Sequence, residues 1–284
     1  MNELMRYIRA SANMNQEQFA SALGTTVQSI NRWENGKTLP NNMAQKQIYQ
    51  FCLGNNINIS EHIIHAKEFA HSDDKLILYH GSKKGLQGEI APVSHKACDF
   101  GKGFYMGTTA LQPLTLICAE AKPKFYTVEL DLTGLKVLRV GIDMDWAMLI
   151  AYYRKEMEEA KGTAIYEKYA HFADGCDIIV GHIANDRMYT ELSRFFNRTL
   201  TDVALLNCLS ALDPGMQYVA VTEKACKQIR IVKEESLHPL ELSALIDLSV
   251  ARRKEGIALA EDMEVMYRRE GKFFDEILRG GFHE

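Results

Sequence analysis

Three segments of the sequence combine the residue types from which ligand sites are built. The first is His80-Gly81-Ser82 at the end of an expected strand, and the second is the glycine-punctuated string Gly101–Tyr105. The third is Gln217-Tyr218-Val219 on an expected late strand. The glycine spacing matches neither a dinucleotide-binding fingerprint nor a P-loop, so the string does not predict a nucleoside-triphosphate cradle. Each segment alone is a weak signal, and only their order and spacing together are informative.

Together the three segments resemble the ADP-ribosyltransferase superfamily, in the His-Tyr-Glu branch of diphtheria toxin and the poly(ADP-ribose) polymerases. Within it the chain is most similar to a group of bacterial domains of unknown function, DUF3990. The shared strings are Tyr79–Ser82, Asp99–Tyr105 and Gly181–Asp186. This resemblance covers roughly residues 76–230. It implies an α+β fold with a split antiparallel sheet and NAD in the cleft between its two small halves.

The resemblance implies NAD as the substrate and a role for each motif. Gly81 would hold the nicotinamide carboxamide through its backbone, His80 would bind the adenosine-side ribose, and Tyr105 would stack on the nicotinamide ring. The nicotinamide–ribose bond would break through an oxocarbenium-like state, and an acceptor nucleophile would take the ADP-ribose. The implied catalytic residues are His80, Tyr105 and Gln217. The implied NAD-contacting residues come from the first two motifs: His80, Gly81, Ser82, Asp99, Gly101, Lys102, Gly103, Phe104 and Tyr105.

The third motif departs from the family pattern, because Gln217 stands where the polymerases have glutamate. An amide can accept a hydrogen bond from a ribose hydroxyl, but it carries no charge and cannot act as a base. NAD binding is therefore expected to survive better than turnover. Glu223 is an alternative carboxylate on the following turn. Leu116 falls near the place of a second stacking tyrosine, which predicts a less enclosed nicotinamide face.

The first 60 residues have the helix signals of a helix-turn-helix module. Asn15 and Thr25 are expected to cap successive helices, with a glutamine three residues after each, and Gly24 separates those helices. Trp33 is expected in the core. The stretch from Asn15 to Lys37 resembles the phage-repressor and Cro (XRE-type) family, whose third helix enters the DNA major groove. The expected DNA-facing residues are Gln16, Thr26, Val27, Gln28, Asn31, Arg32 and Lys37.

Within this set, Gln28 and Asn31 are expected to read adenine edges, and Arg32 to read guanine or hold a phosphate. Gln16 and Lys37 are expected to contact the DNA backbone. Double-stranded DNA is thus an expected partner, bound by a homodimer on two half-sites. The alternative is a module that serves only dimerisation or protein docking.

Three parts are predicted along the chain: a helix-turn-helix domain at 1–70, a transferase-like domain at 76–235 and a helical extension at 236–284. The polar stretch 71–74 marks the first boundary. The extension is either a lid on the second domain or a dimer contact. Asp186 and Arg187 open a helix and are either functional or merely part of its capped start. The pair His62 and His65 is interpreted as an exposed helical pair, so no metal is expected.

Composition is that of a globular protein with an uneven distribution of charge. The chain has 284 residues and a net charge of -4. Residues 1–60 carry a balance of +2, so the N-terminal part is the one suited to phosphates. The six cysteines are scattered, which predicts reduced and mostly buried thiols. No apolar run long enough for a membrane span and no signal-peptide pattern occur, so a cytoplasmic location is expected.

The leading hypothesis is an NAD-dependent ADP-ribosyltransferase fused to a DNA-binding domain, as a bacterial toxin–antitoxin or phage-defence component. Its acceptor is a protein or a nucleic acid, and an antitoxin is a possible partner. The alternative is a transcription regulator whose catalytically weak domain senses NAD or ADP-ribose. A third interpretation is a repressor whose second domain only oligomerises.

Overall fold

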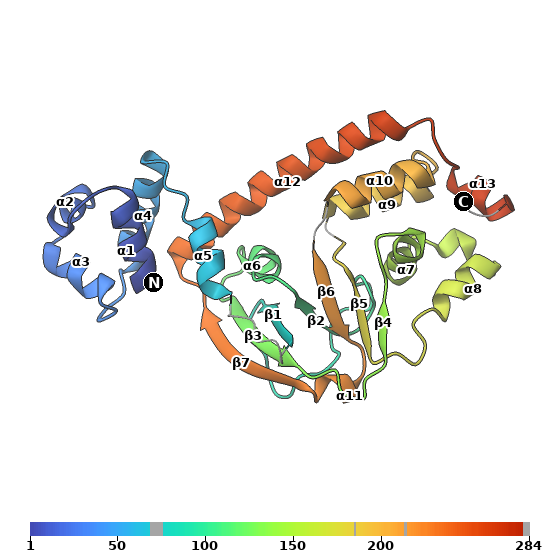
Figure 1. Cartoon of the computed structure of the whole chain (residues 1–284), viewed down its shortest axis with the longest axis horizontal. Coiled ribbons are helices and arrows are strands. Elements are labelled where there is room, and N and C mark those ends of the chain that lie inside the picture. The colour runs from blue at the N-terminus through green and yellow to red at the C-terminus, as the bar shows by residue number, and fades with distance from the viewer. Residues whose placement is uncertain (69–75, 185, 213–214, 281–284) are drawn as a thin grey trace.

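The computed structural model describes residues 1–68, 76–184, 186–212 and 215–280 of the chain. The expected boundary at 71–74, Asn185, and part of the turn before the last motif lie outside these residues. Among the described residues, no helix has both the length and the apolar character needed to cross a membrane. A helical module at one end is followed by a sheet domain, and one long helix runs over both (Figure 1).

The N-terminal module is a bundle of short helices around one apolar core. Leu4, Ile8, Phe19, Ile30 and Trp33 are buried, which confirms Trp33 as a core residue. The five helices are α1 (Asn2–Ser11), α2 (Gln16–Ala22), α3 (Val27–Glu34), α4 (Asn42–Gly54) and α5 (Ser60–Lys67).

The helix caps follow the sequence in one place and differ in another. Asn15 and Gln18 form the expected capping box, and Gly24 adopts the left-handed conformation with a φ of 60°. The expected cap at Thr25 is wrong, because Thr26 caps α3 by accepting a hydrogen bond from the Ser29 amide at 3.1 Å. Thr26 is the residue that has the extended backbone of an N-cap. The Thr26 side chain, which was expected to face DNA, is therefore engaged in this helix cap.

A buried carboxylate ties α1, α2 and α3 together. The Glu34 side chain is only 4% exposed, and its Oε1 lies 2.6 Å from Arg9 Nε. Gln16 Nε2 donates to Glu34 Oε2 at 2.8 Å. Burial alone would raise the pKa of Glu34, but the bonds from Arg9 and Gln16 outweigh it and hold the pKa below its ordinary value. Glu34 thus fixes α3 against α1 through Arg9 and against α2 through Gln16.

The second part is built on one mixed sheet of seven strands. The strand order is β4-β5-β6-β2-β1-β3-β7, in which β4 and β5 are parallel and the other neighbours are antiparallel. The strands are β1 (Leu76–Ser82), β2 (Phe104–Gly107), β3 (Lys124–Leu130), β4 (Val137–Arg139), β5 (Ile178–His182), β6 (Met216–Ala220) and β7 (Ile229–Ser236). Two separate small sheets were expected, whereas the described strands form a single sheet that is sparsely paired between β1 and β2.

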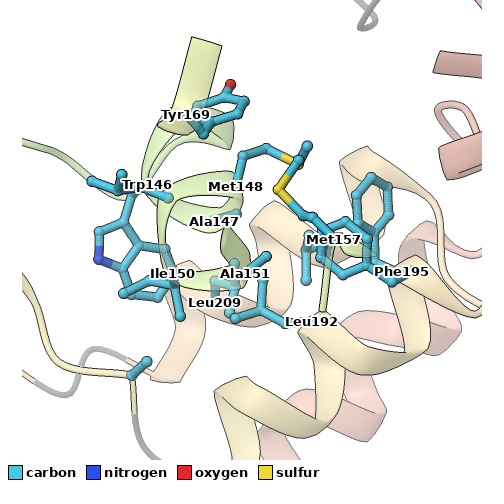
Figure 2. Close-up of a cluster of buried hydrophobic side chains, with 14 of the residues drawn as sticks. Trp146, Ala147, Met148, Ile150, Ala151, Met157, Tyr169, Leu192, Phe195 and Leu209 are labelled. Carbon is cyan, nitrogen blue, oxygen red and sulfur yellow. The ribbon is translucent and has the colours of Figure 1, made fainter. Parts of the chain in front are cut away.

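Helices cover one face of the sheet. Behind β5 and β6 lies one buried cluster, which includes Trp146, Met148 and Ile150 of α7 and Leu192 and Phe195 of α9 (Figure 2). Residues 146–151 are all buried, as the absence of a polar face on this stretch predicts. The helices of the domain are α6 (Leu111–Ile117), α7 (Met144–Arg154), α8 (Ala164–Ala170), α9 (Asp186–Phe196), α10 (Asp202–Leu212), α11 (Glu223–Cys226), α12 (Pro239–Tyr267) and α13 (Phe274–Gly280).

The other face of the sheet is covered largely by the segment between β1 and β2. Leu86 and Ile90 of that segment pack on a cluster that includes Leu78, Phe104 and Val180. Side chains alternate between the two faces along each strand, so neighbouring motif residues enter different cores.

The C-terminal extension is dominated by α12, which spans the molecule along one side (Figure 1). Its first turns pack on α4 and α5, and its second half packs on α10. Leu240, Ala244 and Leu245 belong to the same buried cluster as Ile48 of α4 and Tyr79 of β1. The helix-turn-helix module and the sheet therefore share a hydrophobic core, into which the extension is built.

Replacing Arg9 with methionine would leave the Glu34 carboxylate buried with Gln16 as its remaining partner. We expect the free energy of unfolding to fall by about 2 kcal/mol or more, because a buried charge without its counter-ion is costly. Urea denaturation at pH 7 measures the loss. Arg6→Met is the matched control, since Arg6 donates one exposed hydrogen bond to Asn35, and its change should stay within about 0.5 kcal/mol. Equal losses would contradict a structural role for the buried pair.

Candidate functional site

The three sequence motifs lie on three neighbouring strands. Strand β2 carries Tyr105 and is flanked by β1 with His80 and by β6 with Gln217. Gly107 of β2 is in register with Tyr79 on one side and with Gln217 on the other. The fold thus brings together segments that are more than a hundred residues apart in the sequence.

The three expected catalytic side chains do not share one face of the sheet. Directly opposed residues point to the same face, so Tyr79, Gly107 and Gln217 share a face with Tyr105. His80 follows Tyr79 and points to the other face, where its ring stacks on Phe104 at 4.3 Å between centroids. His80 is therefore separated by the sheet from Tyr105 and Gln217, and only a ligand that enters between the strands can meet both sides.

The pairing between β1 and β2 is interrupted beside His80, and we call this unpaired stretch the opening. Along the described strands, their register contains the single pair Tyr79 and Gly107, so the backbone from His80 to Ser82 is paired with β3 and not with β2. A side chain at Gly81 would lie 2.8 Å from Ile117 Cγ2 and 2.9 Å from the Pro113 carbonyl oxygen. A glycine is thus required at position 81 because α6 lies so close. The backbone groups of Gly81 on the side of β2 remain available to another hydrogen-bonding group.

His80 bridges the opening with its side chain. Its Nδ1 lies 2.7 Å from the carbonyl oxygen of Tyr105. Because a carbonyl only accepts, Nδ1 carries the proton, and Nε2 is the ring nitrogen that can accept a hydrogen bond. Burial lowers the pKa of His80, and the bond to the Tyr105 carbonyl offsets this only in part. The imidazole is therefore neutral near pH 7 and suited to accept a hydrogen bond from a ligand hydroxyl.

The glycine string forms a tight loop that its own tyrosine closes. The Tyr105 hydroxyl donates to the Gly101 carbonyl at 2.7 Å and accepts from the Phe100 amide at 3.0 Å. Gly101 has a φ of 71°, and a side chain there would lie 2.7 Å from the Tyr153 ring. At Gly103 a side chain would collide with Val219 on β6. Gly101, Gly103 and the Tyr105 hydroxyl, which were expected to contact the ligand, are thus also required to form the loop itself.

Asp99 is the charged centre of this part of the fold. It is 6% exposed and accepts from Arg154 Nε at 3.1 Å and from the Ala184 amide at 2.9 Å. A second Arg154 nitrogen forms an ion pair with it. Gln217 Nε2 donates to Asp99 Oδ2 at 2.9 Å and to the His182 carbonyl at 3.2 Å. We call these residues (Asp99, Arg154, His182, Ala184 and Gln217) the Asp99 cluster.

The Asp99 cluster explains the amide at position 217. Both hydrogens of the Gln217 amide nitrogen point to acceptors, one of them a carboxylate. A glutamate there would place a second negative charge beside Asp99 and would lose both donors. The charge of the Asp99 carboxylate is balanced by Arg154, so no net negative charge replaces the missing glutamate.

The remaining candidate residues are spread around this region. Lys102 is exposed, whereas Ser82 is half-buried and lies opposite Lys124 of β3. Leu116 is 71% exposed and encloses nothing. Glu223 is exposed and opens α11 beyond the end of β6.

Arg187 forms an ion pair within its own helix. Its NH2 lies 2.7 Å from Glu191 Oε1, and Glu191 is fully buried. The pairing ties down the start of α9, so Arg187 has a structural partner within its own helix.

Sequence reasoning missed the partners of Asp99. Arg154 ends α7, outside all three motifs, and Ala184 lies in the string Gly181–Asp186 that supported the resemblance. A charged residue at the end of an apolar helix was the available signal, but its partner is 55 positions away.

The expected DNA-facing surface lies on α3, on the side of the module remote from the sheet (Figure 1). Val27, Gln28, Asn31, Arg32 and Lys37 are all exposed. Gln16 is half-buried, and its amide nitrogen is already bound to Glu34. The middle of α3 is thus exposed, although Asn31 Oδ1 accepts from Asn35 Nδ2 at 3.3 Å, and the Gln16 amide is engaged with Glu34.

The expected exposed histidine pair on α5 is only partly right, because His65 is exposed whereas His62 is half-buried. The His62 ring stacks on Tyr7 at 4.3 Å between centroids. In the described part of the chain, no group of three or more His, Cys, Asp or Glu side chains is arranged to hold a metal ion. All six cysteines are free thiols, four of them buried.

Changing Gln217 to glutamate should destabilise the protein. We expect a loss of about 2 kcal/mol at pH 8, because two carboxylates would meet in a buried site. The pKa of one would be raised in the folded state, so the loss should shrink as the pH falls towards the pKa of an unfolded glutamate. Denaturant titrations at several pH values measure this, with exposed Gln87→Glu as the control. Adding Asp99→Asn should restore part of the stability, and a neutral or stabilising Gln217→Glu would contradict the assignment.

Comparison with known families covers both parts of the chain. Residues 5–43 match a family described as Helix-turn-helix. Residues 76–231 match the family described as Protein of unknown function (DUF3990), which spans β1 to β7 and all three motifs. Searches of curated proteins and of solved structures returned no match. Since the second match covers more than half of the chain, the protein belongs to the DUF3990 family and carries a helix-turn-helix domain at its N-terminal side.

Proposed function

We propose that the DUF3990 domain is an NAD-dependent ADP-ribosyltransferase domain, fused to a helix-turn-helix domain that binds double-stranded DNA. The observation that carries this proposal is the opening between β1 and β2. It places an unpaired backbone edge at Gly81 beside a neutral His80 with a free Nε2. A carboxamide can both donate to and accept from such an edge, as a neighbouring strand would.

The proposed reaction breaks the bond between the nicotinamide nitrogen and ribose C1′. Nicotinamide leaves as a neutral molecule with the bonding electrons, and the acceptor adds to C1′ and loses a proton. Gly81 would hold the carboxamide and His80 Nε2 would accept from a ribose hydroxyl. Gln217 would contribute a neutral amide where positive charge develops on the ribose, and this stabilises the charge less than a carboxylate would.

A second candidate is an NAD- or ADP-ribose-sensing regulator with little or no turnover. The Asp99 cluster favours it, because the nitrogen of Gln217 is held by Asp99 and the charge of Asp99 is held by Arg154. Ligand binding would depend on β1, whereas stabilisation of positive charge on the ribose would depend on Gln217 of β6, whose amide nitrogen is already bound. The toxin–antitoxin or phage-defence role and the identity of the acceptor stay predictions.

The DNA-binding part of the proposal rests on α3. Its exposed middle carries Gln28, Asn31 and Arg32, side chains whose donors and acceptors suit base edges or phosphates. The buried pair of Glu34 and Arg9 holds this helix rigidly against α1. A fixed helix with an exposed polar face is what recognition in the major groove requires.

His80→Ala should weaken NAD binding at least tenfold, because the bridging imidazole and its free acceptor are removed. Titration calorimetry measures binding, and release of nicotinamide from NAD, with and without DNA and cell lysate, measures turnover. His171→Ala is the control, since His171 is exposed and pairs only with Asp174. Release that disappears in the His80 variant supports the transferase, and binding without release supports the sensor. Absence of both in the wild-type protein would refute the NAD proposal.

Gln28→Ala and Lys37→Ala should affect DNA binding in different ways. Loss of a base contact should lower affinity for a selected duplex about tenfold and leave binding to random DNA unchanged. Loss of a phosphate contact should weaken both and reduce the salt dependence. Fluorescence anisotropy on duplexes selected from a random pool by the wild-type protein measures this, with exposed Gln50→Ala as the control. Failure of the wild-type protein to enrich any duplex would contradict the DNA-binding role.

A further inference from the structure

The helix-turn-helix module is joined to the rest of the protein by a set of buried polar contacts on α12. Gln45 of α4 is 3% exposed, and its Oε1 accepts from the Leu240 amide at 3.1 Å. Its Nε2 donates to the Pro40 carbonyl at 2.9 Å. Leu240 lies in the first turn of α12, where amide groups have no partner inside the helix. The module therefore caps the helix that links it to the sheet domain.

Three further contacts continue this joint along α12. Ser60 Oγ donates to the Ala244 carbonyl at 3.1 Å, and the Tyr49 hydroxyl bonds to Asp247. Lys67 lies between two glutamates, with Nζ 3.1 Å from Oε1 of both Glu235 and Glu241. Glu241 also accepts from the His238 amide at 2.8 Å. We call the contacts of Gln45, Tyr49, Ser60 and Lys67 with α12 and its approach the α12 joint.

The shared core extends the joint to the ligand opening. Tyr79 packs in the same cluster as Ile48, Leu240 and Leu245. Its neighbour His80 bridges β1 and β2, and Gly81 presses against α6, whose Leu114 and Ile117 belong to that cluster too. His80 thus lies at the opening, while Tyr79 and Gly81, on the opposite face of β1, contact the cluster that is shared with the helix-turn-helix module.

An open groove lies beside the α12 joint. An open groove of about 320 Å³ runs between α5, the start of α6 and α12, and is lined by Glu61, His65, Thr109, Leu111 and Arg252 among others. The joint is therefore closed at the α12 contacts and unfilled beside them.

We propose that β1 and the α12 joint couple the ligand opening to α3, so that NAD and DNA change each other's affinity. This inference rests on the proposed function for the identity of its ligand. By linkage, NAD must change DNA affinity by the same factor by which DNA changes NAD affinity. We expect a factor of at least five, the lower end of the usual range for allosteric coupling.

The joint itself is tested first without any ligand, by hydrogen exchange and calorimetric unfolding of the full chain. Gln45→Ala should speed exchange in α4 and at the start of α12, and should separate the unfolding of the module from that of the sheet domain. Lys46→Ala is the control, because Lys46 is exposed on the same helix. Tyr49→Phe removes a single hydroxyl and should produce the same change in smaller measure. Separate unfolding of the two parts in the wild-type protein would overturn the proposal.

The coupling is then tested with NAD and a selected duplex. Wild-type protein should bind the duplex with at least fivefold different affinity when NAD is saturating, and Tyr49→Phe or Gln45→Ala should bring the ratio towards one. NAD binding with unchanged DNA affinity would overturn the coupling and leave the proposed function standing. Absence of NAD binding by calorimetry would instead refute the proposed function, and with it the coupling.

Discussion

The buried carboxylate of Asp99 is the constraint on which the second domain depends. It receives donors from α7, from the loop after β5 and from β6, three elements that are far apart in the sequence. A carboxylate buried without such donors would be costly, so the three elements are fixed where their donors reach it. Asp99 also begins the glycine string, and its placement sets the loop that the Tyr105 hydroxyl closes. The position of β2 between β1 and β6 follows from this arrangement.

The same carboxylate separates two properties that a transferase normally combines. The charge that would stabilise an oxocarbenium-like state is paired with Arg154, and Gln217 offers only a neutral amide. The groups of β1 that we propose to bind the ligand are untouched by this pairing, because His80 and the Gly81 edge lie at the opening on the other side of β2. In the proposed function, ligand binding therefore depends on β1, whereas turnover depends on β6. The first would persist in a domain whose turnover is slow.

Sequence reasoning predicted the local features and missed those that depend on distant partners. The capping box of Asn15, the left-handed Gly24 and the buried Trp33 follow from short patterns and are confirmed. The cap of α3 was misplaced by one residue, since Thr25 and Thr26 are chemically alike and only the backbone distinguishes them. The amide at 217 was interpreted as a weakened glutamate, because its partner Asp99 is 118 positions away. The shared core around α12 could not be predicted either, because an apolar helix face does not identify the element on which it packs.

A crystal structure of the full chain grown with NAD tests the central claim most directly. The account predicts nicotinamide between β1 and β2, with its carboxamide hydrogen-bonded to the Gly81 backbone. It also predicts a ribose hydroxyl within hydrogen-bonding distance of His80 Nε2, and an Asp99 cluster that is unchanged. NAD bound elsewhere, for example in the groove between α5 and α12, or crystals without NAD at saturating concentration, would contradict the assignment of the opening as the ligand site.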